Sequence, residues 1–219
     1  MTRKRNKFFH IHAMVVFVLM VSLTSFVWAA PGPVTDCLKG TLDKIIDILN
    51  DPSLKTSGKE NERRNTLLKL IKDRFDEEAF SRRALGVQWK KRTKEEKQEF
   101  VEIFSDLLER TYLKKIDDYL AKAGNFSGKN IAYLNETVKG RYVIVKTKVI
   151  VNDETQIPVL YLFANKQGKW LAVDIAIEGV SLVKNYRAQF KEILANSSFA
   201  ELITKLKSKQ QKETTEKKE

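Results

Sequence analysis

The spacing of the apolar residues changes once along the chain, and this change constrains the fold more than any other feature. Between residues 38 and 123, apolar side chains recur every three or four positions, as Phe100 and Phe104 do. Between residues 130 and 177 they alternate with polar ones, most clearly in Arg141–Val151. The first spacing is typical of amphipathic helices and the second of strands with one buried face. The chain is therefore predicted to fold with its helices and strands segregated in sequence.

Short turn-like connections separate the predicted strands, which favours an antiparallel sheet. The strands are predicted at residues 130–136, 141–151, 157–164 and 170–177. Two helices follow, the first from Ser181 to about Ala195 and the second from Ser198. We expect an α+β fold in which N-terminal helices and two C-terminal helices pack on a twisted antiparallel sheet of about four strands.

The N-terminus has the layout of a secretory signal peptide. Basic residues lie between Arg3 and Lys7, an apolar core follows at Ala13–Val27, and Val27-Trp28-Ala29 has the spacing of a cleavage site. The apolar run is also long enough to span a bilayer, so an uncleaved anchor is the alternative. We predict that residues 1–29 are removed, that residues 30–206 form one domain, and that residues 207–219 form a charged, disordered tail.

Composition excludes several classes of function. The formal net charge is +12, and +8 remains without residues 1–29. Such a charge could favour nucleic acid, but export and the dispersed lysines argue against that partner. His10 and His12 both lie in the predicted signal peptide, so the mature chain has no histidine, and Cys37 is its one cysteine. A zinc site with the usual ligands, an internal disulfide and a Ser-His-Asp or Cys-His catalytic arrangement are therefore excluded. We expect no enzyme activity, metal or cofactor.

A predicted strand-to-helix corner occupies Trp170–Phe190. Asp174 and Glu178 are an even number of positions apart and are expected on one face of the strand. Gly179 offers backbone conformations that other residues resist. The two acids could cap the following helix or pair with Arg187, one or two turns along it. Because nothing nearby supplies a nucleophile or base, we interpret them as structuring the corner and not as a catalytic pair.

Two ordered blocks of residues resemble one protein family. The first block comprises Phe75-Asp76, Ala84-Leu85-Gly86 with Trp89, the capping box and helix start Thr93–Phe100, and Thr111-Tyr112. The second comprises Trp170, Asp174, Ile177–Val183, Asn185-Tyr186-Arg187 and Gln189-Phe190. At this spacing behind a signal peptide, the chain resembles the MlaC-type periplasmic phospholipid-binding proteins, also called the toluene-tolerance auxiliary family, from about Leu38 to Leu206.

The resemblance implies a soluble periplasmic carrier that moves phospholipid between the outer and inner membranes, with bound phospholipid as cargo and no cofactor. It implies docking on an inner-membrane ABC transporter with an MCE-domain subunit and on an outer-membrane lipoprotein–porin complex. Three alternatives remain open: a carrier of another envelope lipid such as a hopanoid, a membrane-anchored docking subunit, and an enzyme on a cone-shaped α+β scaffold. The missing histidine disfavours the enzyme.

The family resemblance also implies an apolar cavity between helices and sheet, with the lipid head group outside. Each buried methylene contributes about 0.8 kcal/mol, so acyl chains need shielding from water. For every candidate wall residue, an ordinary place in the core is the alternative. The candidates are Phe80, Trp89, Phe104, Leu108, Tyr112, Val145, Val149, Tyr161, Phe163, Val173, Val180 and Val183. Arg187 could bind the lipid phosphate, because its planar fork suits that anion.

Overall fold

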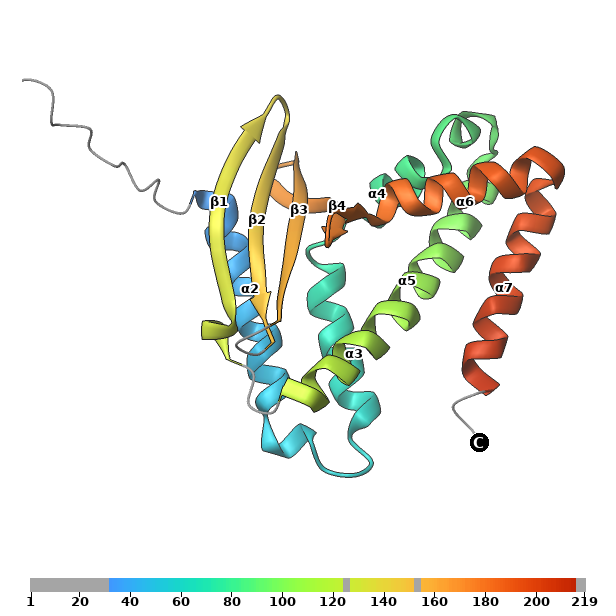
Figure 1. Ribbon diagram of the computed structural model, residues 1–219. Coiled ribbons are helices and arrows are strands. Elements are labelled where there is room, and N and C mark those ends of the chain that lie inside the picture. Colours follow the sequence, from blue (N-terminus) through green and yellow to red (C-terminus); the bar gives the residue numbers. More distant parts are fainter. Residues whose placement is uncertain (1–31, 124–126, 152–154, 216–219) are drawn as a thin grey trace, which may run out of the picture. The chain divides into compact units, whose positions relative to one another are not determined.

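The computed structural model describes residues 32–123, 127–151 and 155–215, so the predicted signal peptide lies outside the described residues. The helical first half comprises α2 (Pro33–Asn50), α3 (Glu60–Lys72), α4 (Glu77–Leu85) and α5 (Lys94–Ala123), with short 3₁₀ helices η1 (Pro52–Leu54), η2 (Gly86–Lys91) and η3 (Gly128–Asn130). The second half comprises β1 (Ile131–Lys139), β2 (Tyr142–Ile150), β3 (Gln156–Lys166), β4 (Lys169–Ile177), β5 (Val180–Ser181), α6 (Leu182–Asn196) and α7 (Phe199–Thr215) (Figure 1). The single change of period along the sequence is thus the boundary between α5 and β1.

The strands form one antiparallel sheet in the order β1-β2-β3-β4-β5. The predicted α+β fold and its four main strands are confirmed. The fifth strand is a two-residue addition, in which Ser181 pairs with Ala176 and Val180 pairs with Ile177. It forms because the chain reverses at Glu178 and Gly179, both of which have positive φ. Two residues are too few to show a period, so alternation cannot predict this strand.

Helices cover the sheet at both ends of its strand order. α2 contacts β1 and β2, whereas α4 and α6 contact β4. The part of the β4 edge that β5 does not pair is covered by the segment before α4. There the Asp76 amide donates to the Ala172 carbonyl at 3.0 Å, and the Ala172 amide donates to the Arg74 carbonyl at 2.8 Å. These contacts fix the start of α4 against the strand that leads into the corner.

Two hydrophobic clusters result. The helical core is built by α4–α7 and η2, and its buried members are Phe80, Ala84, Leu85, Trp89, Phe100, Ile103, Phe104, Leu107, Leu182, Val183, Tyr186, Phe190, Phe199, Leu202, Ile203 and Leu206. The sheet core lies between α2 and the sheet, and its buried members are Val34, Leu38, Val143, Val145, Phe163 and Ala172. Phe75 packs against both clusters and so connects them.

Local hydrogen bonds set the ends of several helices. In the predicted capping box of α5, the Thr93 amide donates to Glu96 at 2.8 Å and the Glu96 amide donates to the Thr93 hydroxyl at 3.2 Å. α7 begins with the same arrangement between Ser198 and Glu201. These contacts span three residues, which is why the sequence can predict them.

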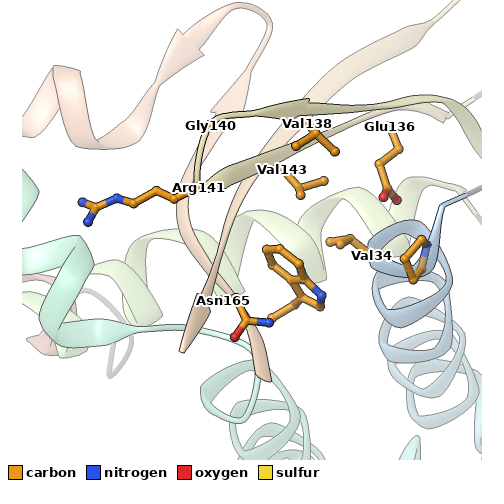
Figure 2. A pocket seen from close by; sticks show the side chains of 9 residues that line it. Val34, Glu136, Val138, Gly140, Arg141, Val143 and Asn165 are labelled. Atoms are coloured by element: carbon orange, nitrogen blue, oxygen red, sulfur yellow. The ribbon is translucent and has the colours of Figure 1, made fainter. Parts of the chain in front are cut away.

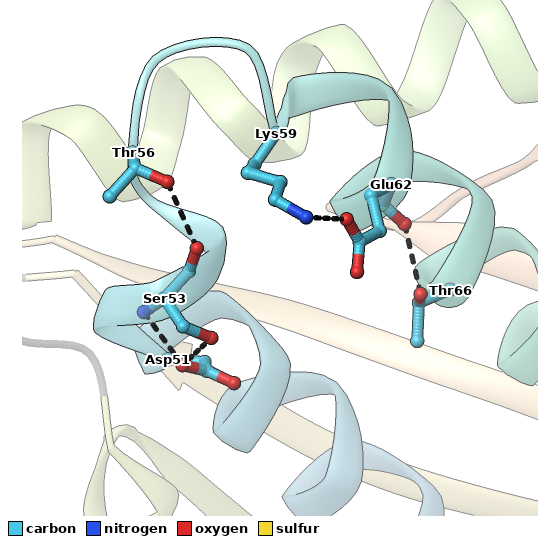
Figure 3. Close-up of polar contacts among 6 residues, drawn as sticks. All are labelled: Asp51, Ser53, Thr56, Lys59, Glu62 and Thr66. Atoms are coloured by element: carbon cyan, nitrogen blue, oxygen red, sulfur yellow. Dashed lines mark hydrogen bonds and ion pairs between the residues drawn. The ribbon is translucent and has the colours of Figure 1, made fainter.

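The connection between α2 and α3 is also held by local contacts, shown in Figure 3. The Asp51 carboxylate accepts from the Ser53 amide at 2.8 Å and from the Ser53 hydroxyl at 2.7 Å. The hydrogen bond from the Ser53 hydroxyl is the main reason that the pKa of Asp51 is lowered. Lys59 pairs with Glu62 in the first turn of α3. These side chains shape a connection and bring no chemistry to it.

α7 is longer than the sequence predicts. A disordered tail is expected from residue 207, but the helix continues to Thr215. Lysine, glutamine and glutamate dominate this stretch, and all three are good helix formers, so the helix can continue without an apolar face. None of the helices in the described ranges is long and apolar enough to cross a membrane.

Candidate functional site

At the strand-to-helix corner, Asp174 caps α6. Its side chain is buried, with the residue 8% exposed, and its carboxylate accepts from the Ser181 hydroxyl at 2.7 Å and from the Val183 amide at 3.2 Å. The Ser181 hydroxyl in turn accepts from the Lys184 amide at 3.1 Å. Helix N-termini have unpaired amides and favour negative charge, so this carboxylate satisfies both needs.

The sequence predicts that Glu178 and Asp174 share a strand face, but in the structure they do not. β4 ends at Ile177, and Glu178 lies in the following turn with φ of 51° and an exposed side chain. Its amide donates to the Pro158 carbonyl at 2.9 Å. The next residue, Gly179, has φ of 81°, a conformation that favours glycine. The two acids of the corner therefore have different environments and cannot act as a pair on one surface.

Arg187 bonds to the end of α4 instead of to an acid. Its Nε donates to the Arg83 carbonyl oxygen at 2.7 Å, and its Nη2 donates to the same atom. The last carbonyls of a helix lack partners within it and attract positive charge. In the described part of the chain, Arg187 makes no ion pair. The predicted pairing with Asp174 or Glu178 is therefore absent there. Arg187 joins α6 to α4.

The predicted cavity residues from the helices pack closely together. Phe80, Trp89, Phe104 and Val183 are buried in the helical core, and Leu108 and Tyr112 pack against it. The Phe104 ring centroid lies 6.1 Å from that of Phe80, and burial raises the pKa of the Tyr112 hydroxyl. The structure thus places these side chains against one another, as in an ordinary aromatic core.

The predicted residues from the strands divide into three groups. Val145 and Phe163 are buried in the sheet core, with Tyr161 packed against it. Burial raises the pKa of Tyr161 to about 12. Val149 is half-buried on β2 between Ile131 and Ile157. Val173 is buried at a β-bulge, where Phe163 pairs with Ala172 and Leu162 pairs with Asp174.

Among the predicted cavity residues, Val180 fits a buried cavity wall least well. It is 56% exposed, and it lies on the two-residue edge strand β5. Alternation along that strand directs Ser181, and not Val180, toward the buried Asp174 carboxylate. Val180 is therefore outside both hydrophobic clusters, and its place in a cavity wall stays an untested prediction.

An apolar pocket of about 430 Å³ lies elsewhere, between the first turn of α2 and the ends of the β1–β2 and β3–β4 hairpins (Figure 2). Its lining residues are Pro33, Val34, Glu136, Val138, Gly140, Arg141, Val143, Asn165 and Trp170. Its volume is in the range of small-molecule sites. None of the predicted cavity residues lines it. Val143 could have been found from the sequence, because it alternates on one face with Val145, and Trp170 begins the second motif block.

Glu136 closes one side of this pocket against α2. Its Oε2 accepts from the Thr35 amide at 2.6 Å and from the Thr35 hydroxyl at 2.7 Å. A side chain at Gly32 would put its Cβ 2.2 Å from Glu136 Oε1, so a larger residue there would displace this carboxylate. The carboxylate thus caps α2 from a strand 101 residues away. The one acid in the pocket wall is already satisfied, and Val34, Val138, Val143 and Trp170 leave the wall apolar.

Within the described ranges, no group of three or more potential metal ligands is assembled. The arrangement instead offers an apolar pocket that borders the sheet core, since Val34 and Val143 belong to both. Such a site can shield apolar groups from water.

Comparisons with known proteins agree on one family. The model of the MlaC protein family matches residues 39–208. The intermembrane phospholipid transport system binding protein MlaC of Haemophilus influenzae is 22% identical over 206 residues, which cover 92% of each chain. A phospholipid-binding protein from Ralstonia solanacearum, solved in complex with a phospholipid, has the same fold, with a TM-score of 0.68 and 24% identity over 82% of this chain and 97% of that one. The family match spans most of the chain, and we conclude that this protein belongs to the MlaC family.

Proposed function

We propose that this protein is a phospholipid carrier that holds the acyl chains of one lipid in its apolar interior and moves that lipid between two membranes. The observation that carries the proposal is the family match over residues 39–208. It is supported by the named function of the Haemophilus relative and by the lipid bound to the Ralstonia protein. We propose no catalytic role, since no histidine occurs after His12.

The pocket at the hairpin ends is the proposed entrance for the acyl chains. At about 430 Å³ it is closed at its inner end by the sheet core, so longer chains require α2 to move away from the sheet. Polar contacts that hold α2 in the described structure include the Glu136–Thr35 pair and the Arg74 Nε, which donates to the Thr41 hydroxyl at 2.9 Å. Each methylene that enters gains about 0.8 kcal/mol, so a chain of ordinary length can offset the loss of such contacts.

We propose that some of the predicted wall residues contact the acyl chains deeper in the molecule, beyond the pocket. Val145, Tyr161 and Phe163 lie in the sheet core directly beyond the pocket and are proposed to contact the acyl chains when α2 moves. The helical-core candidates belong to the other cluster, which Phe75 connects to the sheet core. We therefore expect the sheet-core residues to contact the lipid before Phe80 or Phe104 does.

We also propose that residues 1–29 direct export to the periplasm and are then cleaved. The partners would be an inner-membrane ABC transporter with an MCE-domain subunit and an outer-membrane lipoprotein–porin complex. The word "intermembrane" in the name of the relative supports this placement. N-terminal sequencing of the protein from the periplasmic fraction should begin near Ala30. A sequence that begins at Met1 in a membrane fraction would instead favour an anchored subunit.

The carrier proposal is tested by organic extraction of natively purified, folded protein. We expect about one phospholipid per protein, measured as extracted phosphate and identified by mass spectrometry. A hopanoid in the extract would change the cargo but keep the carrier function. An extract without lipid from folded protein would contradict the proposal.

A pair of variants on β1 tests whether the lipid occupies the pocket. Val138 lines the pocket and is 71% exposed, so Val138→Trp should fill the pocket without disturbing the core. Leu134 is 51% exposed on the same strand and does not line the pocket, so Leu134→Trp is the matched control. We expect Val138→Trp to lower the lipid content at least several-fold and Leu134→Trp to leave it unchanged. Equal lipid content in both variants would place the lipid elsewhere.

A further inference from the structure

Two arginines from separate elements meet at one tyrosine beside the pocket. Arg141, in the β1–β2 turn, donates from Nη2 to the Tyr142 hydroxyl oxygen at 2.8 Å. Arg83, on α4, donates from Nη1 to the same oxygen at 3.5 Å. Their guanidinium carbons lie 5.0 Å and 5.6 Å from the centre of the Tyr142 ring. The fold thus brings two permanent positive charges to a single phenol.

These charges have no acid partner among the described residues. Other arginines do have one: Arg64 pairs with Glu109 at 3.1 Å, and Arg92 pairs with Glu96 at 3.3 Å. In addition, the Nε of Arg83 is buried and has no hydrogen-bond acceptor. A buried donor without an acceptor is costly, and two adjacent like charges add to that cost. An anion at this position would relieve both.

The phenol itself responds to these surroundings. The pKa of Tyr142 is lowered, first by the hydrogen bond from Arg141 and also by the positive charges of Arg141 and Arg83. An anion that neutralises the two guanidinium groups should therefore raise the pKa of Tyr142, and this change can be followed by tyrosine absorbance.

One member of the cluster, Arg141, also lines the apolar pocket, but its guanidinium end points away from Val143 and Val34, which line the interior (Figure 2). A molecule with its apolar part in the pocket could therefore place a polar group beside this guanidinium. The predicted head-group residue, Arg187, is instead engaged with the carbonyl oxygen of Arg83.

We propose that Arg83, Arg141 and the Tyr142 hydroxyl form a binding site for a phosphodiester monoanion, which is the phosphate of the carried phospholipid. The proposal rests on the carrier function for the source of the phosphate. Both guanidinium groups present a nitrogen within 3.5 Å of one oxygen atom, so a single phosphate group can accept from both. Arginine forks match phosphate oxygens in geometry and charge, and the Tyr142 hydroxyl can donate a further hydrogen bond.

The first test measures lipid selection. Folded protein is incubated with vesicles that contain phosphatidylglycerol and diacylglycerol with identical acyl chains, repurified, and analysed by mass spectrometry for the ratio of the two bound lipids. The variant Arg83→Gln with Arg141→Gln should lower the ratio of phospholipid to diacylglycerol about tenfold or more. The control, Arg82→Gln with Lys139→Gln, removes the same charge from exposed neighbours and should leave the ratio unchanged. Arg83→Lys, which keeps the charge but loses the fork, should give an intermediate ratio.

The second test needs no bound lipid. Glycerophosphoglycerol, the same head group without acyl chains, is added to the full-length protein at constant ionic strength, and tyrosine ionisation is followed by ultraviolet absorbance. Binding should raise the pKa of one tyrosine in the wild type and in the charge control. The signal should be lost in Tyr142→Phe and in the double arginine variant.

The outcomes separate the site from the carrier function. An altered lipid ratio together with the Tyr142 signal supports the proposal in full. A Tyr142 signal with an unchanged lipid ratio, in protein that does load lipid, overturns the lipid phosphate as the source and leaves a site for free phosphodiesters. A Tyr142 signal in protein that loads no lipid of either kind keeps the site and contradicts the carrier function. No Tyr142 signal and an unchanged ratio overturn the site.

Discussion

Removal of the Asp174 carboxylate should destabilise the protein through the start of α6. Asp174→Ala removes the acceptor for the Ser181 hydroxyl and for the buried Val183 amide. Ser181 is half-buried and still bonds to the Lys184 amide, whereas the Val183 amide is left buried without a partner. A lost cap costs about 0.5–2 kcal/mol, and a buried unsatisfied donor costs about 1–3 kcal/mol. Since these two costs overlap, the total lies below their sum, and we expect the free energy of unfolding to fall by about 1–4 kcal/mol.

The measurement is urea unfolding followed by far-ultraviolet circular dichroism, with linear extrapolation to water and an unchanged slope. Asp174→Asn keeps one acceptor oxygen and should lose about half as much. Glu178→Ala is the matched control, because this second acid of the corner is exposed, and it should change stability by less than about 0.5 kcal/mol. The reasoning would be refuted by a loss below about 0.5 kcal/mol in Asp174→Ala or by equal losses in Asp174→Ala and Glu178→Ala.

Three further perturbations test other parts of the fold. Glu136→Ala removes both hydrogen bonds to Thr35 and should cost about 1–3 kcal/mol in urea unfolding, while Glu136→Gln, which keeps an acceptor, should cost less. Gly86→Ala forces a side chain onto φ of 59° and ψ of −129° and should cost about 1–3 kcal/mol, although its Cβ would have room. Burial raises the pKa of Tyr161 from 10 to about 12, which favours the neutral phenol in the folded protein. The resulting contribution to the free energy of unfolding, about 2–3 kcal/mol, is complete below pH 10 and is lost as the pH rises from 10 to about 12. Stability measured from pH 8 upward should therefore fall more steeply in the wild type than in Tyr161→Phe, and parallel curves would contradict the assigned shift.

The elements of the fold were predictable wherever their cause is local. The period of the apolar residues predicts the long helix and the four main strands, and capping boxes at Thr93 and Ser198 predict two helix starts. The pairing of β5 with β4 was not predictable, because it depends on the reversal at Glu178 and Gly179. Helix α7 shows the opposite limit: good helix formers extend it through a region with no apolar period.

The candidate site was predictable only in part. Periodicity and residue type tell which side chains are buried, and Phe80, Phe104 and Val145 are indeed buried. They do not tell whether the space beside a buried side chain is filled by protein. The pocket forms where the first turn of α2 meets the ends of two hairpins, and the alternating pattern of one strand contains no information about that junction.

The sequence by itself determined the family, the helical and extended segments, the corner at Asp174 and the absence of histidine after His12. Only the tertiary structure decided the long-range partners of Glu136, Arg187 and Arg83. Glu136 caps a helix 101 residues away, Arg187 binds a backbone carbonyl 104 residues away, and Arg83 meets Arg141 on Tyr142. The physical reason is that every residue has a carbonyl and every helix has an unsatisfied end, so packing alone selects which of them a distant side chain reaches.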